Sequence, residues 1–361
     1  MTDAIWMARA IKLAAKGRYT TEPNPAVGCV IVKNGEIVGE GWHQQAGTPH
    51  AEIHALNMAG ANASGATAYV TLEPCAHYGR TPPCAEALVK AGVARVVAAM
   101  VDPNPKVAGK GLKILEDAGI KAESGLLEAD ARALNPGFLK KMETGLPYVR
   151  VKLAASIDGR TALNNGQSKW ITGPEARSDV QRLRAMSGAI ITGAGTVLAD
   201  EPSLNVRLNQ FPEPYPLEQV RQPLRVVLDR RQRLGSDNGF FQVPTPAWVV
   251  SNHQDHRTFP DHVETLRLPE EGFLTALLKK LPVNSVLIEA GAKLAGAFIA
   301  EGLVDELVLY QAPVVMGDQS RGLLALPVFS EMAQAPRFSI KDVRQVGDDI
   351  RLTLEVSCLP A

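Results

Sequence analysis

Residues 49–55 read PHAEIHA, and residues 73–84 read EPCAHYGRTPPC. These two stretches bring a histidine, a glutamate and two cysteines into one short region of the chain. Zinc in proteins is bound by histidine nitrogen and cysteine thiolate, and a catalytic zinc site keeps its fourth position open for water. His50, Cys75 and Cys84 supply three such ligands. They therefore predict a zinc site with one open position.

Two prolines indicate how these residues are placed. Pro49 and Pro83 stand where helices are expected to begin, so His50 and Cys84 fall in first turns, where the helix dipole favours a thiolate. Two residues apart in a regular helix, His50 and Glu52 would point to different faces. Both must therefore lie at the start of the helix, where Glu52 can take a proton from water and return it to a leaving amine.

The neighbouring polar residues allow alternatives. A structural zinc site would need a fourth protein ligand, which His54 or His77 could supply, whereas the catalytic interpretation leaves His54 as support for His50 or as plain packing. His77 and Arg80 lie in the loop between the two cysteines, where we expect substrate contact in preference to simple solvation. Asn24, between two prolines, is interpreted in the same way.

The composition limits the classes of protein that fit. The 361 residues suffice for two or three domains, and Lys plus Arg equals Asp plus Glu, which disfavours polymeric nucleic acid as a partner. Charges interrupt the apolar N-terminal segment, so we expect an amphipathic helix and neither a signal peptide nor a membrane span. Four cysteines make no disulfide framework, which favours the cytoplasm. Cys29, in an apolar strand, is expected in the core.

Strand-like and helix-like stretches alternate along the chain, which is typical of α/β domains. A hairpin is expected around Asn34-Gly35, and another near the C-terminus around Gly347-Asp348. The stretch around residues 134–147 carries several prolines and glycines, and we interpret it as a linker with a boundary near Gly145. The predicted domains are 1–146 and 147–361. The first half has predicted helices over 49–60, 82–92 and 109–119, and predicted strands over 66–72 and 94–102.

The motifs carry a resemblance to a known family. His-x-Glu followed by Pro-Cys is the signature of zinc deaminases that act on nucleobases, although here eight residues separate the two cysteines. With PNPAVGCVIV before it and DPNPKVAGKG after it, PCAHYGRTPPC resembles the deaminases of the riboflavin pathway. KLAASIDGR, SKWITG, ITGAGTVLADEP and LIEAG resemble the reductase half of the same bifunctional family. The resemblance covers nearly the whole chain.

The resemblance implies a cytidine-deaminase-like zinc domain followed by a dihydrofolate-reductase-like α/β domain. It implies zinc-dependent hydrolytic deamination of 2,5-diamino-6-ribosylamino-4(3H)-pyrimidinone 5′-phosphate, then reduction of the ribosyl group to ribityl by NADPH. The family's zinc ligands correspond to His50, Cys75 and Cys84, and its proton shuttle to Glu52. It also implies a homodimer that binds this small phosphorylated pyrimidine.

The same resemblance supplies positions in the second half. Those for NADPH are Ala154, Trp170, Thr196, Asp200 and the turn at Gly291, and those for the substrate are Ser168, Arg184, Leu204, Arg207 and Glu289. ITGAGTVL and LIEAGAKLAGAFI each run from strand through glycine turn to helix, which suits phosphate binding. Neither contains G-x-G-x-x-G, which disfavours an ordinary Rossmann domain. The planar forks of Arg184 and Arg207 could each hold a substrate phosphate. Lys152, Asp200 and Glu289 are candidate proton donors.

One position departs from the family pattern. After the strand LRVVLD, relatives carry a small hydroxyl residue associated with NADP, but here Arg230 and Arg231 follow Asp229. Both arginines could be solvated loop charges. Alternatively, one of them could contact the 2′-phosphate and select NADPH over NADH.

Three other functions are weighed against this one. A deaminase of tRNA or DNA is disfavoured by the neutral charge and by the second α/β domain. A nucleoside deaminase or a non-enzymatic zinc module would leave the second half unexplained, because fold alone does not separate these functions whereas the paired motifs do.

Overall fold

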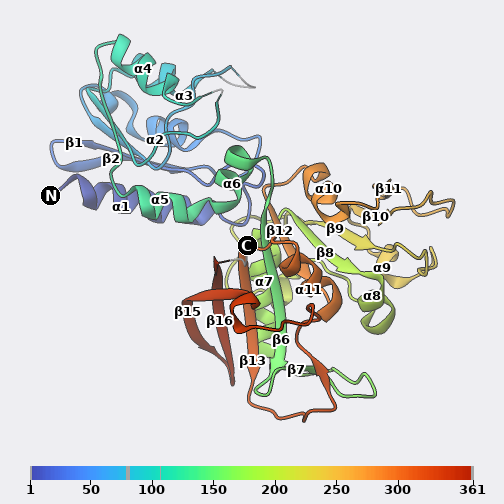
Figure 1. Cartoon of the computed structure of the whole chain (residues 1–361). Helices are drawn as coiled ribbons and strands as arrows, with labels where there is room; N and C mark the ends of the chain where they lie inside the picture. The colour runs from blue at the N-terminus through green and yellow to red at the C-terminus, as the bar shows by residue number, and fades with distance from the viewer. Residues whose placement is uncertain (1, 79–81, 106, 359–361) are drawn as a thin grey trace. The chain divides into compact units, whose positions relative to one another are not determined.

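The structure is a computed structural model that describes residues 2–78, 82–105 and 107–358. Arg80 lies outside the described residues. The chain divides into two compact units, residues 1–146 and 147–361 (Figure 1). Every helix in the described part of the chain is too short or too polar to cross a membrane.

The first unit is built on a sheet of five strands in the order β2-β1-β3-β4-β5. Its strands are β1 (Gly28–Lys33), β2 (Glu36–Trp42), β3 (Thr67–Val70), β4 (Arg95–Ala98) and β5 (Lys121–Ser124). β1 runs antiparallel to β2 and β3, whereas β3, β4 and β5 are parallel. The first predicted hairpin is confirmed: Asn34 and Gly35 form its turn with φ of 54° and 79°, as a tight hairpin turn requires.

Helices cover both faces of this sheet, as Figure 1 shows. They are α1 (Asp3–Ala14), α2 (Ala51–Ala59), α3 (Cys84–Lys90), α4 (Lys110–Asp117), α5 (Glu128–Leu134) and α6 (Pro136–Thr144). Successive strand residues point to opposite faces. Cys29 and Ile31 belong to the core cluster that contains α2, α3 and α4 residues, whereas Val30 and Val32 belong to the cluster with α1 residues. The core position predicted for Cys29 is confirmed.

The predicted linker is mostly helix. Pro136 begins α6, Leu139 is buried, and Gly145 ends the helix with a φ of 77°. Proline in the first turn and glycine just after the last turn are boundary signals of a helix as much as of a loop. The interpretation of residues 134–147 as a linker was therefore wrong, because the apolar residues between the two signals pack against the first unit.

The second unit has a sheet of nine strands in the order β11-β10-β9-β8-β12-β6-β13-β16-β15. These strands, with the separate pair β7 and β14, are β6 (Tyr148–Ser156), β7 (Arg160–Ala162), β8 (Ala189–Gly193), β9 (Leu224–Leu228), β10 (Ala247–Ser251), β11 (Val263–Arg267), β12 (Ser285–Glu289), β13 (Glu306–Ala312), β14 (Arg321–Gly322), β15 (Arg337–Val346) and β16 (Asp349–Cys358). Strands from β11 to β13 are parallel, and β16 and β15 add an antiparallel hairpin at one edge. The second predicted hairpin is confirmed.

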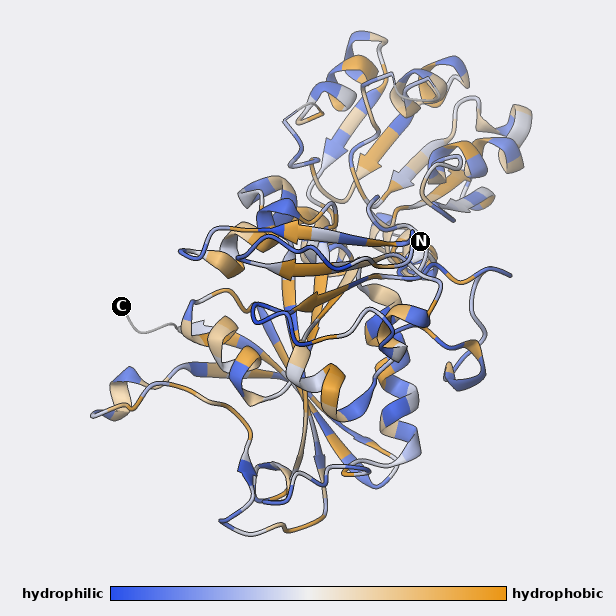
Figure 2. Ribbon diagram, turned by 90° about the vertical axis from the view of Figure 1, so that its right-hand side faces the viewer, coloured by the Kyte–Doolittle hydropathy of each residue, from blue (hydrophilic) through white to orange (hydrophobic). Residues whose placement is uncertain are grey.

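The parallel part of this sheet is buried on both faces. The helices of the unit are α7 (Pro174–Met186), α8 (Ala194–Asp200), α9 (Gly239–Gln242), α10 (Phe273–Lys280) and α11 (Ala292–Ala300). Ile190 and Leu287 belong to a core cluster with α7, and their neighbours Ile191 and Ile288 are also fully buried. Figure 2 shows apolar colour along the strands, as expected for a sheet covered on both faces.

Candidate active sites

The structure brings His50, Cys75 and Cys84 together in the first unit. His50 is the N-cap of α2, with an extended backbone, Cys84 is the first residue of α3, and Cys75 lies in the loop after β3. Their ligand atoms all lie within 4.8 Å of one another. The Nδ1 atom of His50 is 3.6 Å from the sulfur of Cys75 and 3.3 Å from that of Cys84. Because His50 precedes the regular helix, it can share one site with Glu52.

These three residues fit a catalytic zinc ion. Among the described residues, no other histidine, cysteine or acidic side chain joins this group, so the protein leaves a fourth position open. His54 is outside the group, and its buried Nε2 has no hydrogen-bond partner in the described part of the chain. His77 is exposed in the loop after Cys75. The donor set of one imidazole and two thiols suits zinc.

Glu52 lies in the first turn of α2 and is 3% exposed. Burial raises the pKa of its carboxyl group to about 7, which suits a group that both takes and gives a proton near neutral pH. A hydrogen bond from Cys84 lowers the pKa of Cys75 to about 4, and the same bond, together with burial, raises the pKa of Cys84.

Sequence reasoning missed His43, which joins Asn24 to this site. Its Nε2 is 3.2 Å from Nδ2 of Asn24, and its Nδ1 is 3.1 Å from the carbonyl oxygen of Pro49. Its ring packs edge to face against that of His50, with centroids 5.3 Å apart. His43 follows the end of β2, and no motif spacing singles it out.

Asp102 is a second residue that sequence reasoning missed. It is 7% exposed in the loop after β4. Burial raises its pKa to about 6, while the N–H of Asn104, and His77 more weakly, act in the opposite direction. The N–H of Asp102 donates to Glu73, two residues before Cys75, at 3.1 Å, so this loop lies near the loop that carries Cys75.

In the second unit, the predicted glycine turns lie at the carboxyl ends of neighbouring parallel strands. β8 leads through Gly193 into α8, and β12 leads to Gly291, the N-cap of α11. A Cβ at Gly193 would lie 3.7 Å from Leu294 of α11, so the two turns are adjacent, whereas a Cβ at Gly291 would meet nothing within 4 Å. Open α/β sheets bind nucleotides outside the carboxyl ends of their strands, which is where these two turns lie. The arrangement fits NADPH.

Arg184 and Arg207 have different partners. Nε and Nη2 of Arg184 donate to the two carboxyl oxygens of Glu289 at 2.6 and 2.9 Å. The fork of Arg184 therefore holds Glu289, and its predicted contact with a substrate phosphate stays a prediction. Arg207 donates to the neutral oxygens of Ser203 and Gln210, at 2.8 and 3.1 Å, so its charge is not neutralised by these contacts.

Lys152 lies beside Glu289, its partner in the parallel pair of β6 and β12. Burial lowers the pKa of Lys152, Glu289 opposes this change, and the charge of Arg184 adds to it. Burial would raise the pKa of Glu289, but Arg184 and Lys152 hold it below its usual range. Ala154, two residues after Lys152, is half-buried on the same strand.

The remaining predicted positions lie on and after α8 and in the segment before α7. Thr196 and Asp200 are on α8, and Lys169 donates to the carbonyl oxygen of Asp200 at 3.4 Å, which places Ser168 and Trp170 close to the end of this helix. Trp170 is 72% exposed. Leu204 is buried with a φ of 47°.

The arginines after β9 also differ from one another. Arg230 forms an exposed ion pair with Glu270 at 3.0 Å and lies over the ring of Phe273. Arg231 is exposed. Nη2 of Arg233 lies 3.9 Å from the point where a Cβ on Gly195 would stand, and its guanidinium has no side-chain partner within the described residues.

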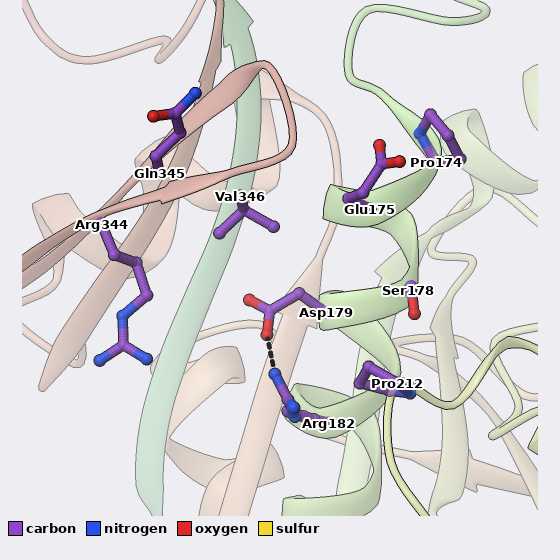
Figure 3. Close-up of a pocket in the computed structure, with 9 residues that line it drawn as sticks. All are labelled: Pro174, Glu175, Ser178, Asp179, Arg182, Pro212, Arg344, Gln345 and Val346. Carbon is purple, nitrogen blue, oxygen red and sulfur yellow. Dashed lines mark hydrogen bonds and ion pairs between the residues drawn. The ribbon is translucent and has the colours of Figure 1, made fainter.

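A pocket of about 570 Å³ opens between α7 and β15 (Figure 3). Its charged lining residues include Glu175, Asp179, Arg182 and Arg344. The carboxyl group of Asp179 already accepts hydrogen bonds from Tyr310 at 2.7 Å and from Arg182 at 3.0 Å. None of the predicted site residues lines this pocket, and we assign it no role.

Comparison with known proteins matches both units to families. Residues 1–100 match the cytidine and deoxycytidylate deaminase zinc-binding region, and residues 147–352 match the RibD C-terminal domain. The predicted order, a deaminase-like zinc domain followed by an α/β reductase domain, is confirmed.

Relatives match over nearly the whole length. The riboflavin biosynthesis protein RibD of Haemophilus influenzae is 55% identical over 359 residues, 97% of this chain and 96% of the relative. That of Escherichia coli is 54% identical over 364 residues, 98% of this chain and 99% of the relative. The solved structure of Acinetobacter baumannii RibD, form 1, is 52% identical with a TM-score of 0.93, and the alignment covers 99% of each chain. A Thermotoga maritima diaminohydroxyphosphoribosylaminopyrimidine deaminase/5-amino-6-(5-phosphoribosylamino)uracil reductase is 32% identical with a TM-score of 0.87, over 98% of each chain.

Proposed function

The chain belongs to the RibD family of bifunctional riboflavin biosynthesis deaminase–reductases, and from this premise we propose which residues carry each reaction. The deaminase domain is zinc-dependent and the reductase domain uses NADPH. We further propose that the substrate is 2,5-diamino-6-ribosylamino-4(3H)-pyrimidinone 5′-phosphate, by analogy with the activity named for the Thermotoga maritima relative.

In the deaminase domain, His50, Cys75 and Cys84 would hold the zinc ion. Zinc, when bound, lowers the pKa of a water molecule so that it can attack at neutral pH. Glu52 takes a proton from the attacking water and delivers it to the departing amine, for which its burial and its pKa of about 7 are suited. Asn24 and His77 are proposed substrate contacts, and Arg80 is proposed from the sequence alone.

One observation carries this assignment. Three ligand atoms from separate elements lie within 4.8 Å of one another, and a buried carboxyl group lies two residues after one of the ligands. A structural zinc site would have a fourth protein ligand in place of the open position. The geometry therefore supports hydrolysis at zinc in preference to a purely structural metal.

In the reductase domain, the turns at Gly193 and Gly291 border the proposed NADPH site, together with Ala154, Trp170, Thr196 and Asp200. NADPH supplies a hydride when bound. The reduction adds this hydride at C1 of the ribosyl group, and the ring oxygen that C1 releases must gain a proton. The half-buried Lys152 is the proposed proton donor, because its pKa is lowered by desolvation and its ammonium group therefore gives up a proton more readily.

The two arginines proposed for the substrate site have different roles. Arg207 is the proposed phosphate ligand, since neutral side chains are its hydrogen-bond partners. Arg184 would act by orienting Glu289, which it holds through two hydrogen bonds. Ser168 and Leu204 are the other proposed substrate positions.

Two assays on the purified chain test this function. Ammonia release and NADPH oxidation are followed with the diaminopyrimidinone ribosyl phosphate and, separately, with cytidine. We expect ammonia from the first compound only, followed by NADPH oxidation. Ammonia release from cytidine, or deamination without any later NADPH oxidation, would contradict the proposal.

The two domains are proposed to work independently, with the boundary after Leu146. Each unit has its own sheet and its own candidate site. A chain of residues 147–361 should oxidise NADPH when it is given the deaminated intermediate. A fragment that folds by circular dichroism yet lacks this activity would show that the reductase site needs the first domain.

A homodimer is proposed from the family resemblance. Ile340 and Val343 on the edge strand β15 are 63% and 57% exposed, and a second copy could cover them. Light scattering would test this, since a monomeric mass contradicts it. We also propose a cytoplasmic location, where the free thiols of Cys75 and Cys84 would stay reduced.

A further inference from the structure

Glu73 is a buried carboxyl side chain that the reactions above do not use. It lies two residues before Cys75 and is 3% exposed. Backbone N–H groups donate to its two carboxyl oxygens from Asp102 at 3.1 Å, Gly109 at 2.8 Å, Gly111 at 2.8 Å and Leu112 at 3.4 Å. One side chain thus binds both ends of the loop between β4 and α4.

Three of these donors belong to the start of α4. The first N–H groups of a helix have no partner within the helix, and a side chain at the N-cap usually accepts from them. The N-cap here is Gly109, which has no side chain to do so and has a φ of 82°. Glu73 supplies the missing acceptor from another part of the chain.

Gly111 shows how closely α4 approaches this part of the chain. A Cβ at Gly111 would lie 1.9 Å from the carbonyl oxygen of Pro74, the residue between Glu73 and Cys75. Only glycine permits this contact. The glycines of GKG at 109–111 and the EPC sequence at 73–75 therefore form one packed unit.

The loop held in this way borders the zinc site. Asp102 is bound through its N–H group to Glu73, two residues before Cys75, and Gly111 of α4 lies against the carbonyl oxygen of Pro74, the residue before Cys75. If the carboxyl group of Glu73 were lost, both ends of the loop would lose their anchor. The backbone of Asp102 and the start of α4 would then no longer be held against the turn that carries Cys75.

We propose that Glu73 is a positioning residue for deamination: it fixes Asp102 and the start of α4 against the turn that carries Cys75, and so holds this border of the deaminase site in place. This inference rests on the proposed deaminase site. Glu73 accepts hydrogen bonds from backbone N–H groups of Asp102 and of the start of α4, so we expect its effect on how well substrate is held.

Glu73→Gln tests this role. Glutamine keeps the size of the side chain but replaces one acceptor oxygen with an NH2 donor, which cannot accept from backbone N–H groups. We expect one zinc per chain, an unchanged reductase rate and a KM for deamination raised roughly tenfold, because buried donors lose their partner. Asp117→Asn, an exposed carboxyl at the other end of α4, is the matched control and should leave both reactions unchanged.

The outcomes separate positioning from simple destabilisation. A variant that is merely unstable would lose zinc and kcat together, as the active fraction falls, at an unchanged KM; that result, or wild-type kinetics, overturns the proposal. If Glu73→Gln does not fold, the variant Gly109→Ala tests the same role. It disturbs the N–H donors at the start of α4 through backbone strain and leaves Glu73 intact. It must raise KM, and an unchanged KM refutes the role. A wild-type chain without zinc or deamination would refute the proposed deaminase site instead.

Discussion

The two candidate sites are assembled in different ways. The zinc site is local: His50, Cys75 and Cys84 lie close in sequence, and two helix starts and one loop bring them together. The reductase site is distributed, since Lys152 and Glu289 are far apart in sequence and meet only because β6 and β12 are neighbours in the sheet. A local site can be identified from a motif, whereas a distributed site depends on strand order, which no short motif contains.

The largest effect expected is that of Cys75→Ser. A hard hydroxyl replaces a soft thiolate, so zinc should be lost and deamination should fall by at least about 10,000-fold, while the reductase domain keeps its rate. Elemental analysis and the two assays measure these quantities. Cys29→Ala, at a core cysteine, serves as the control that retains zinc. Stoichiometric zinc in Cys75→Ser would contradict the ligand assignment.

Glu52→Gln should separate the metal from the chemistry. All three ligands remain, so zinc stays at one per chain, but the proton carrier is gone and deamination should fall roughly 100- to 10,000-fold. The reductase rate is the internal control. Equal loss of zinc and of activity would show that Glu52 supports the metal and does not move protons.

The fold was predictable where local signals agree with one another. Asn34-Gly35 and Gly347-Asp348 marked two hairpins, because tight turns demand residues that tolerate positive φ. The same kind of signal misled at Pro136 and Gly145, because these residues mark the start and the end of a helix. This helix packs against the first unit, and no local signal in the sequence shows that packing. Strand order in the larger sheet was also beyond reach, since it depends on contacts between distant strands.

The candidate sites follow the same division. His50 and Cys84 were found from ligand spacing, but His43 was missed because its role comes from a ring contact and two hydrogen bonds made after folding. Phosphate binding by Arg184 stays a prediction, while its pairing with Glu289, across 105 positions of sequence, was not foreseen. A fork of this type suits any oxyanion, so residue type alone could not distinguish a phosphate from a carboxyl group.

Lys152→Met tests the distributed site. Methionine preserves much of the side-chain volume but has no proton to give, so reduction should fall roughly 100-fold or more while deamination is unchanged. Binding of NADPH, followed by its fluorescence, should persist. Lys279→Met, an exposed residue of α10, is the control. Loss of NADPH binding together with the rate would assign Lys152 to the cofactor site and leave the proton donor to Asp200 or Glu289.

The smallest effect concerns the arginines that distinguish this chain from its relatives. Sequence reasoning pointed to Arg230 or Arg231 as the contact for the 2′-phosphate of NADPH. In the structure Arg230 pairs with Glu270, whereas Arg233 lies beside Gly195, in the first turn of α8, the helix that follows the turn at Gly193. Arg233 also has no side-chain partner in the described part of the chain, so its charge is available to a ligand.

We therefore expect Arg233→Ala to weaken the binding of NADPH by about tenfold and to leave the binding of NADH nearly unchanged. A tenfold loss corresponds to one charge-assisted hydrogen bond of about 1.5 kcal/mol. Arg230→Ala should have less effect on NADPH, because an exposed ion pair with Glu270 competes for its guanidinium. Titration calorimetry with NADP+ and NAD+ measures both variants apart from catalysis. If Arg230→Ala causes the larger loss of affinity, and for NADP+ alone, then Arg230 breaks its ion pair with Glu270 and contacts the 2′-phosphate itself. If either variant weakens both cofactors equally, that arginine supports the turn and does not select the cofactor.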